Sequence, residues 1–222
     1  MKKRVLAIAA TAMATMMMAS PVMAQDFKIG ICNYVDDASL NQIVDNIQSR
    51  LEELGKEKGV TFDVSYDNCN ADANVMEQII SDFQADNVDL MVGIATPVAM
   101  RMQSATEGTD TPVVFIAVSA PVAAGVITDM DHPDKNATGT SNAIPVSDIF
   151  ALNNQLTPDC KTFGFLYCTS EVNSVNTIEA AKEYCDANGL SYKEATVTNS
   201  SEVQQAAQSL VGSVDAMFVP ND

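Results

Sequence analysis

The residues best placed to do chemistry in this chain are polar side chains that directly follow short apolar runs. Thr96-Pro97, after the apolar run at 90–95, is the clearest case. Thr is a favoured N-cap and Pro a favoured first helical residue, so the free amides of residues 98 and 99 should point beyond the preceding strand. With the positive end of the helix dipole behind them, such amides bind a carboxylate or a phosphate. The alternative is that Thr96 only caps its own helix.

A second polar cluster follows a later apolar run and consists of Glu171, Asn173 and Ser174. Asn173 or Ser174 is expected to cap a helix, so two helix starts would face each other across a gap. Tyr34 and Tyr167 close two of the apolar runs, and their rings could stack against a ring or an apolar group of a ligand. A place on the rim without a special role is the alternative for both tyrosines.

The chain offers little for catalysis or for metal binding. Its single histidine, His132, lies in a loop rich in Pro and Asp, and the five cysteines include no C-x-x-C pair. We find no G-x-S-x-G elbow, no P-loop and no G-x-G-x-x-G fingerprint. The sequence therefore predicts a binding protein rather than an enzyme, with no cofactor and no metal ion.

The cysteines could form disulfides in an oxidising compartment, and their odd number leaves at least one thiol unpaired. In the usual doubly wound order the first two strands are neighbours, which would bring Cys32 close to Cys69. Cys185 lies near the end of a helix that runs back toward the start of its own strand, where Cys160 lies. We expect two disulfides, Cys32–Cys69 and Cys160–Cys185, with Cys168 free; five reduced thiols are the alternative.

The N-terminus has the pattern of a secretory signal peptide. Lys2-Lys3-Arg4 precedes an apolar stretch at 5–18, and Pro21-Val-Met-Ala24 supplies small residues before a cleavage site. A membrane anchor is the alternative, but the stretch is shorter than the roughly 20 residues that span a bilayer. We expect residues 1–24 to be removed and the product to be secreted, to the periplasm.

Charge narrows the range of partners. Without residues 1–24 the formal net charge falls from −17 to −20, because three of the twelve Lys and Arg residues lie there and no acidic residue does. Such a surface repels nucleic acid and anionic lipid. We expect a monomer that binds neither of them.

The elements that must position these residues are short strands alternating with amphipathic helices. Strands are expected at 27–32, 61–66, 90–95, 112–118, 162–167, 191–197 and 214–219. Helical spacing is clearest from Leu40 to Leu54 and recurs at Ile149, Leu152 and Leu156. This alternation predicts parallel sheets with helices on both faces.

The alternation pauses at 137–141, and Ile144-Pro145 turns the chain. We therefore expect an N-terminal α/β lobe at 25–143 and a partial second α/β lobe at 144–222. A single sheet is the alternative, but so many strands would exceed the usual width. Ligands of open α/β sheets bind beyond the carboxyl ends of the strands, where the polar residues lie.

Several segments, in order, resemble the ABC-transporter substrate-binding family that includes tryptophan- and tyrosine-binding members. They are Lys28-Ile-Gly-Ile31, Asp89-Leu-Met-Val-Gly-Ile-Ala-Thr-Pro97, Pro112-Val-Val-Phe-Ile-Ala-Val118, Asn136-Ala-Thr-Gly-Thr-Ser141, Phe163-Gly-Phe-Leu-Tyr167, Glu171-Val-Asn-Ser174 and Val214-Asp-Ala-Met-Phe-Val-Pro220. The resemblance covers residues 27–222. It implies a type I periplasmic-binding-protein fold, in which two Rossmann-like lobes close on a small molecule and deliver it to a membrane permease.

The resemblance also implies a set of ligand contacts. Beside Tyr34, these positions are Thr96, Ser119, Asn142, Glu171, Asn173 and Ser174, with the stretch Asn221-Asp222 completing the site. Members of the family often carry an Asp before the Pro at the fourth strand end. Here Ser119-Ala120-Pro121 has no acid, so an ammonium contact is not expected at that position. Members also run further, so we expect a C-terminally truncated product whose last strand is an unprotected edge and whose stability is poor.

The sequence thus predicts the solute-binding component of an ABC importer, with a small amino-acid-like ligand, aromatic ones included, in the cleft between the lobes. A periplasmic sensory module that signals through a membrane receptor is the alternative. An exported α/β enzyme is disfavoured because no nucleophile–base pair is found.

Overall fold

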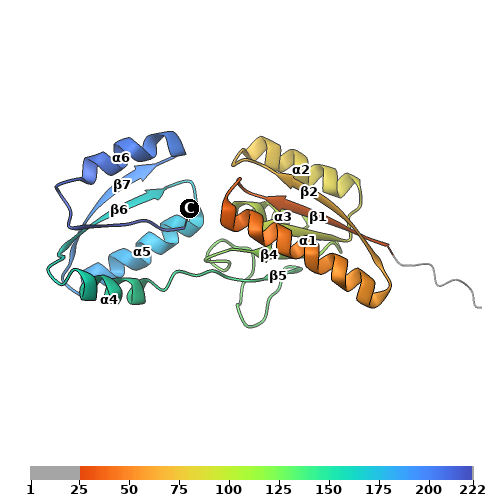
Figure 1. Ribbon diagram of the computed structural model, residues 1–222, viewed down its shortest axis with the longest axis horizontal. Coiled ribbons are helices and arrows are strands. Elements are labelled where there is room, and N and C mark those ends of the chain that lie inside the picture. Colours follow the sequence, from red (N-terminus) through yellow and green to blue (C-terminus); the bar gives the residue numbers. More distant parts are fainter. Residues whose placement is uncertain (1–25, 222) are drawn as a thin grey trace, which may run out of the picture.

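Two α/β lobes, each built on its own parallel sheet, make up residues 26–221, which the computed structural model describes (Figure 1). The predicted signal peptide and Asp222 lie outside these described residues. Among residues 26–221, no helix has the length and apolar character needed to cross a membrane. The separate sheets exclude the single wide sheet considered from the sequence.

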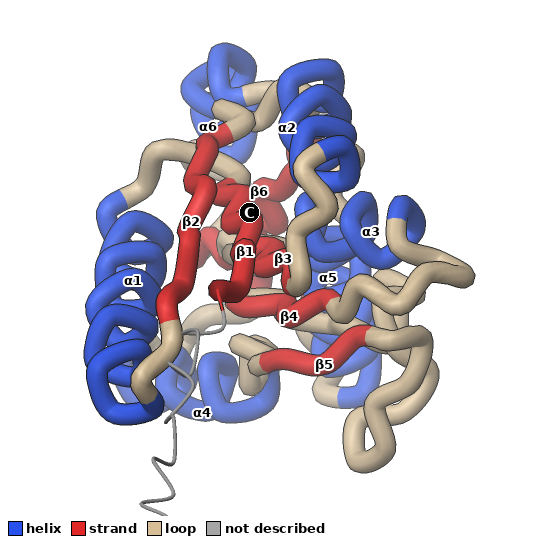
Figure 2. The backbone as a smooth tube through the Cα atoms, turned by 90° about the vertical axis from the view of Figure 1, so that its right-hand side faces the viewer, coloured by secondary structure: helices blue, strands red, loops and turns tan. Residues whose placement is uncertain are grey.

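The first lobe is a five-stranded sheet with the order β2-β1-β3-β4-β5. Its strands are β1 (Asp26–Asn33), β2 (Thr61–Asn68), β3 (Leu90–Ile94), β4 (Val113–Ile116) and β5 (Ala137–Gly139), and its helices are α1 (Ala38–Lys58), α2 (Ala73–Ala85) and α3 (Thr96–Ala105). α1 covers one face of the sheet, and α2 and α3 cover the other (Figure 2). The sheet is doubly wound, as the alternation of strands and helices predicts.

The second lobe has a three-stranded sheet with the order β7-β6-β8. Its elements are α4 (Val146–Leu156), β6 (Thr162–Cys168), α5 (Val172–Ala187), β7 (Ser191–Val197), the 3₁₀ turn η1 (Ser200–Glu202), α6 (Val203–Leu210) and β8 (Ala216–Phe218). α4 and α5 pack on one face and α6 on the other. Phe150 of α4 anchors the larger core, since its ring centroid lies 4.6 Å from that of Phe163 and 4.6 Å from that of Tyr184.

Two local predictions about the first lobe are wrong. The segment at 137–141, expected to lack regular structure, contains β5, which adds a fifth parallel strand beside β4. Such a short strand has no periodicity that a sequence could reveal. Ser39 and Gln42 have the spacing of a capping box, which predicts Ser39 as the N-cap of this helix, but α1 is capped by Asp37, whose carboxylate accepts the amides of Ser39 and Leu40.

The apolar face predicted for α4 is also wrong. Ile149, Leu152 and Leu156 have helical spacing, yet they are 39%, 55% and 74% exposed. The helix instead buries Phe150, which is 1% exposed. A large aromatic side chain buries more area than any of the three aliphatic ones, and it sets which face of the helix points inward.

In each lobe, an aspartate side chain links the central strand to a neighbouring parallel strand through backbone hydrogen bonds. Asp89 precedes β3, and its carboxylate accepts the backbone amide of Lys28 in β1 at 2.7 Å. Asp215 precedes β8, and its carboxylate accepts the amides of Lys161 and Thr162 at 2.9 and 2.8 Å. These two backbone hydrogen bonds hold the pKa of Asp215 below its usual range. Each aspartate thus fixes the start of a parallel strand pair.

A change of pH should reveal the contribution of Asp215 to the free energy of unfolding. Because its pKa is lowered in the folded state, its stabilising effect is present above the unfolded value of about 3.9 and is lost as the pH falls through the folded value. The difference in unfolding free energy between the wild type and Asp215→Asn, from urea titrations, should therefore be constant from pH 7 to 5 and shrink toward pH 3. The exposed residue Asp45 on α1 gives the control, Asp45→Asn, for which no such trend is expected.

Gly30 of β1 lets α2 lie close to the sheet. A Cβ at this position would meet the ring of Phe83 at 2.6 Å. We expect Gly30→Ala to lower the unfolding free energy by about 1–3 kcal/mol through overpacking, as measured by urea denaturation. In Gly30→Ala/Phe83→Leu the smaller side chain makes room, so the double variant should lose less than the sum of the two single variants. Additive losses would contradict this explanation.

Candidate functional site

The carboxyl ends of the two sheets point toward each other, and the residues that follow the strands meet between the lobes (Figure 1). Direct contacts cross the gap. The Ser119 hydroxyl, after β4, lies 2.9 Å from Nδ2 of Asn221, which follows β8. The polar residues selected by the strand-end rule are thus brought to one place from both lobes.

The start of α3 differs in detail from the prediction. Ala95, not Thr96, is the N-cap, with a φ of 77° and its amide bonded to the carbonyl of Ile116 at 2.9 Å. Thr96 is the first helical residue and is 2% exposed, and Pro97 follows it. The first bond within the helix is that of the Ala99 amide to the Ala95 carbonyl. The earlier amides, at 96 and 98, are therefore the free donors of this helix, rather than those at 98 and 99.

Ser119 connects both chain segments that pass between the lobes. Its hydroxyl donates to Oδ1 of Asn142 at 3.1 Å and accepts from Nδ2 of Asn221. Its carbonyl accepts from the hydroxyl of Ser141 at 3.2 Å. Ser141 and Asn142 lie on the first segment that passes from one lobe to the other, and Asn221 lies on the second; we call these segments the first and second crossing. The Ser119 side chain, 7% exposed, thus holds the two crossings together.

The start of α5 supplies the second lobe's share of the site. Glu171 is the N-cap, so the expectation that Asn173 or Ser174 caps the helix is wrong. Both instead lie inside the first turn, 4% and 0% exposed. The side-chain amide of Asn173 donates to the backbone carbonyl of Asn221 at 3.0 Å. This contact orders the second crossing segment against the helix start.

Tyr34, after β1, and Glu171, before α5, come close to each other from the two lobes. Burial raises the pKa of Tyr34 to about 12, and the charge of Glu171 and a hydrogen bond to its carboxylate act in the same direction. The main chain of Tyr34 is held by its own lobe, because its carbonyl accepts the amide of Ala71 at 2.8 Å. Tyr34 thus combines a fixed backbone with a hydroxyl that reaches the other lobe.

Two further strand-end residues, Asn221 and Asn33, belong to the site. Asn221 bridges Ser119 and Asn173, as described above. Asn33 ends β1 and is 0% exposed; its Nδ2 donates to Oδ1 of Asn41 at 3.2 Å. Oδ1 of Asn33 and Oδ1 of Asn173 are buried and have no hydrogen-bond partner among the described residues. The position of Asn33 directly after the strand predicted at 27–32 was the signal that the sequence offered.

Tyr167 is not at the site, although it lies next to the end of β6. Its hydroxyl donates to Glu194 of β7 at 2.8 Å, and Lys182 of α5 lies 2.7 Å from the same carboxylate. Burial and this hydrogen bond raise the pKa of Tyr167. It is a structural residue of the second lobe.

The predicted disulfides are not formed, since all five cysteines are free thiols in the structure. The members of each predicted pair nevertheless share a core. Cys32 and Cys69 belong to one buried cluster of the first lobe, and Cys160 and Cys185 to one of the second. Burial, with the nearby charge of Asp186, raises the pKa of Cys185 to about 11.

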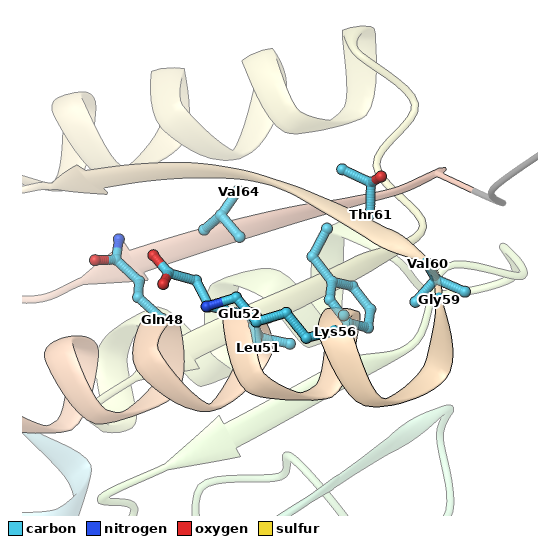
Figure 3. Close-up of a pocket in the computed structure, with 10 residues that line it drawn as sticks. Gln48, Leu51, Glu52, Lys56, Gly59, Val60, Thr61 and Val64 are labelled. Atoms are coloured by element: carbon cyan, nitrogen blue, oxygen red, sulfur yellow. The ribbon is translucent and has the colours of Figure 1, made fainter.

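A groove of about 660 Å³ lies away from the strand ends, between α1 and the edge strand β2 (Figure 3). It is lined by Gln48, Leu51, Glu52, Gly55, Lys56, Gly59, Val60, Thr61, Phe62 and Val64. These residues come from the second half of α1, the turn after it and the first half of β2. The groove is therefore on the outer edge of the first lobe and shares no residue with the site between the lobes.

Comparison with known proteins gives the family. Residues 28–222 match the model of the family described as ABC transporter substrate binding protein. The chain belongs to this substrate-binding family. A tyrosine-binding protein of Clostridioides difficile is 34% identical over 194 residues, which are 87% of this chain and 56% of the relative. This substrate-binding chain thus spans little more than half the length of that relative.

Solved structures agree with this assignment. A domain from Streptococcus pneumonia in complex with L-Trp has a TM-score of 0.82 and 34% identity, covering 89% of this chain and 66% of the other. The ligand-free, open structure of a substrate-binding protein with adhesive properties from Clostridium difficile has a TM-score of 0.63 and 37% identity, covering 88% and 66%. The fold of this substrate-binding chain is that of the type I periplasmic binding proteins, as the resemblance implied.

The contact between Tyr34 and Glu171 should favour the arrangement in which the lobes are closed. Removing the hydroxyl in Tyr34→Phe should cost about 1 kcal/mol in the closed form, which shifts the ratio of open to closed molecules about fivefold. Small-angle scattering of the ligand-free substrate-binding chain should show a larger radius of gyration. Tyr66→Phe, at a tyrosine of β2 that is 37% exposed, is the control and should leave the radius unchanged. Equal radii for the wild type and Tyr34→Phe would contradict the role of this contact.

Proposed function

We propose that this chain carries the ligand cleft of an extracytoplasmic solute-binding component of an ABC importer. The ligand is a small amino-acid-like molecule, and aromatic amino acids are included. The lobes close on the ligand, and a permease in the membrane receives it. Export follows from the signal peptide predicted at 1–24.

The proposal rests on one observation: the cleft offers a ligand both hydrogen-bond acceptors and hydrogen-bond donors. The acceptors are the unpartnered amide oxygens of Asn33 and Asn173 and the carboxylate of Glu171. The donors are the first amides of α3, with the helix dipole behind them. An ammonium group needs acceptors and a carboxylate needs donors, so this combination suits the two charged groups of an amino acid.

The aromatic preference has separate support. Tyr34, half-buried at the rim, offers a ring face beside the cleft, and aromatic pairs favour stacked or edge-to-face contacts. Two of the similar proteins are named for, or bound to, an aromatic amino acid, tyrosine in one case and L-Trp in the other.

The arrangement of the lobes supports a mechanism of closure. At similar identity and coverage, the chain resembles the L-Trp complex more closely than the open, ligand-free structure, with TM-scores of 0.82 and 0.63. A ligand that touches both lobes would stabilise this arrangement through the contacts that exist only when the cleft is closed. The crossings held by Ser119 act as the hinge.

Ligands that differ in one charged group test the proposal. L-Tyr and L-Trp should raise the melting temperature of the mature chain, and calorimetry should give their affinities. Tyramine, which lacks the carboxylate, and 3-(4-hydroxyphenyl)propionate, which lacks the ammonium group, should each bind at least tenfold more weakly than L-Tyr. If neither amino acid binds, or if both analogues bind as well as L-Tyr, the proposal fails.

Glu171 is expected to contact the ammonium group. A hydrogen bond to a charged group contributes about 1.5–3 kcal/mol, so Glu171→Gln should weaken L-Tyr binding about 10- to 100-fold. Binding of 3-(4-hydroxyphenyl)propionate should change much less, because it has no ammonium group to lose. Glu183→Gln on the exposed face of α5 removes the same charge at a distance and is the control. Equal losses for both ligands would assign Glu171 a structural role instead.

A further inference from the structure

Two buried amide side chains of the site are held in one orientation by other polar groups. Asn33, the last residue of β1, is 0% exposed, and Asn173, in the first turn of α5, is 4% exposed. In both, Nδ2 has a hydrogen-bond partner while Oδ1 has none among residues 26–221. A buried acceptor without a partner costs free energy, so each orientation needs a physical cause.

A chain of hydrogen bonds through three side chains fixes the amide of Asn33. Its Nδ2 donates to Oδ1 of Asn41, near the start of α1, at 3.2 Å. Nδ2 of Asn41 in turn donates to Oδ1 of Asp36 at 2.7 Å. This chain of hydrogen bonds leads from a fully buried amide at a strand end to an exposed carboxylate in the loop between β1 and α1.

The carboxylate determines the direction of both hydrogen bonds. An ionised carboxylate can only accept, so Asn41 turns its NH₂ group toward Asp36 and its oxygen toward Asn33. Facing that oxygen, Asn33 presents its own NH₂ group, and its oxygen is left without a partner. Rotating either amide by half a turn would set two oxygens against each other. The charge of Asp36 therefore orients the amide of Asn33 through Asn41.

The second lobe orients its amide more directly. Nδ2 of Asn173 donates to the backbone carbonyl of Asn221 at 3.0 Å and to Oε2 of Glu171 at 3.4 Å. A carbonyl and a carboxylate are acceptors only, so reversing this amide would set its oxygen against two others. Each lobe thus leaves one buried amide oxygen unpartnered among the described residues, oriented by groups that cannot donate.

Both amides lie at the edge where the lobes meet. In the register of the first sheet, Asn33 is level with Ile94, which ends β3 just before the free amides of α3. From the second lobe, Asn221 accepts from Asn173 and donates to Ser119 of the first lobe. The two oriented amides are therefore parts of the same site between the lobes.

We propose that Asp36 and Asn41 are positioning residues of the cleft, which hold Asn33 so that its Oδ1 is offered to the ligand as an acceptor. Together with Oδ1 of Asn173, this oxygen forms a subsite for the N–H donors of a primary ammonium group. The kind of ligand rests on the proposed function. The subsite discriminates by hydrogen-bond polarity, because a ligand oxygen without a hydrogen would face two acceptors there.

Substitutions at position 36 separate orientation from charge. Asp36 is exposed, and α1 keeps its own cap at Asp37, so the fold should tolerate them. Asp36→Ala removes the acceptor and lets both amides rotate, and it should weaken L-Tyr binding about five- to tenfold by calorimetry. Asp36→Asn still offers an oxygen to Asn41, so its affinity should stay within about twofold of the wild type.

Asp37→Asn is the matched control. It removes the same charge one residue away, and Asn caps a helix as well as Asp does, so L-Tyr affinity should stay near that of the wild type. If Asp36→Asn and Asp37→Asn both weaken binding as much as Asp36→Ala, the effect is one of charge and the positioning role is overturned. An unchanged affinity in Asp36→Ala would overturn it as well.

A ligand without the ammonium group gives a readout that a purely structural role would not. Binding of 3-(4-hydroxyphenyl)propionate should be the same in the wild type and in Asp36→Ala, because this ligand has no N–H donor for the subsite. An equal loss of affinity for this ligand and for L-Tyr would assign Asp36 to the support of its loop and overturn the positioning role.

Side-chain amide signals test the orientation without any ligand. In ¹⁵N NMR spectra, the NH₂ protons of Asn33 should exchange with water about fivefold faster in Asp36→Ala than in the wild type, and no faster in Asp37→Asn. Equal rates in the wild type and Asp36→Ala would overturn the chain of hydrogen bonds. If L-Tyr does not bind at all, the proposed function fails, and these exchange rates alone decide whether Asp36 positions Asn33.

Discussion

The hydroxyl of Ser119 is the contact on which the arrangement of the lobes depends. It meets Asn142 on the first crossing and Asn221 on the second, and Asn221 in turn accepts from Asn173 at the start of α5. Without this chain of hydrogen bonds, each lobe would keep its own core, but the two carboxyl edges would have no fixed relation. The cleft is therefore a property of the crossings as much as of the lobes.

The chemistry of the cleft follows from topology. Parallel strands end at one edge of a sheet, and two doubly wound sheets that face each other bring helix starts and strand ends to a common volume. One lobe contributes donors at α3 and the other contributes the carboxylate of Glu171 and the amide of Asn173. Under the proposed function, a molecule carrying both charges would satisfy both lobes only when they are closed, so closure would depend on binding.

The sequence predicted the strand–helix alternation, the two lobes and most of the strand ends, because periodicity and apolar runs report burial directly. The predictions from sequence failed where tertiary contacts determine the local structure. Ala95 and Glu171 cap helices although better N-cap residues lie nearby, Asp37 caps α1 in place of Ser39, and β5 pairs along the edge that β4 offers. Tyr167 lies next to a strand end, as Tyr34 does, yet the facing residues Glu194 and Lys182 give it a different role.

The aspartate that ties the strands occurs once in each lobe, within the segments Val88-Asp89-Leu90-Met91 and Val214-Asp215-Ala216-Met217. The two lobes can thus be superposed in sequence on a single four-residue signature. The same way of starting a parallel strand pair therefore occurs twice in the chain, once in the five-stranded sheet and once in the three-stranded sheet.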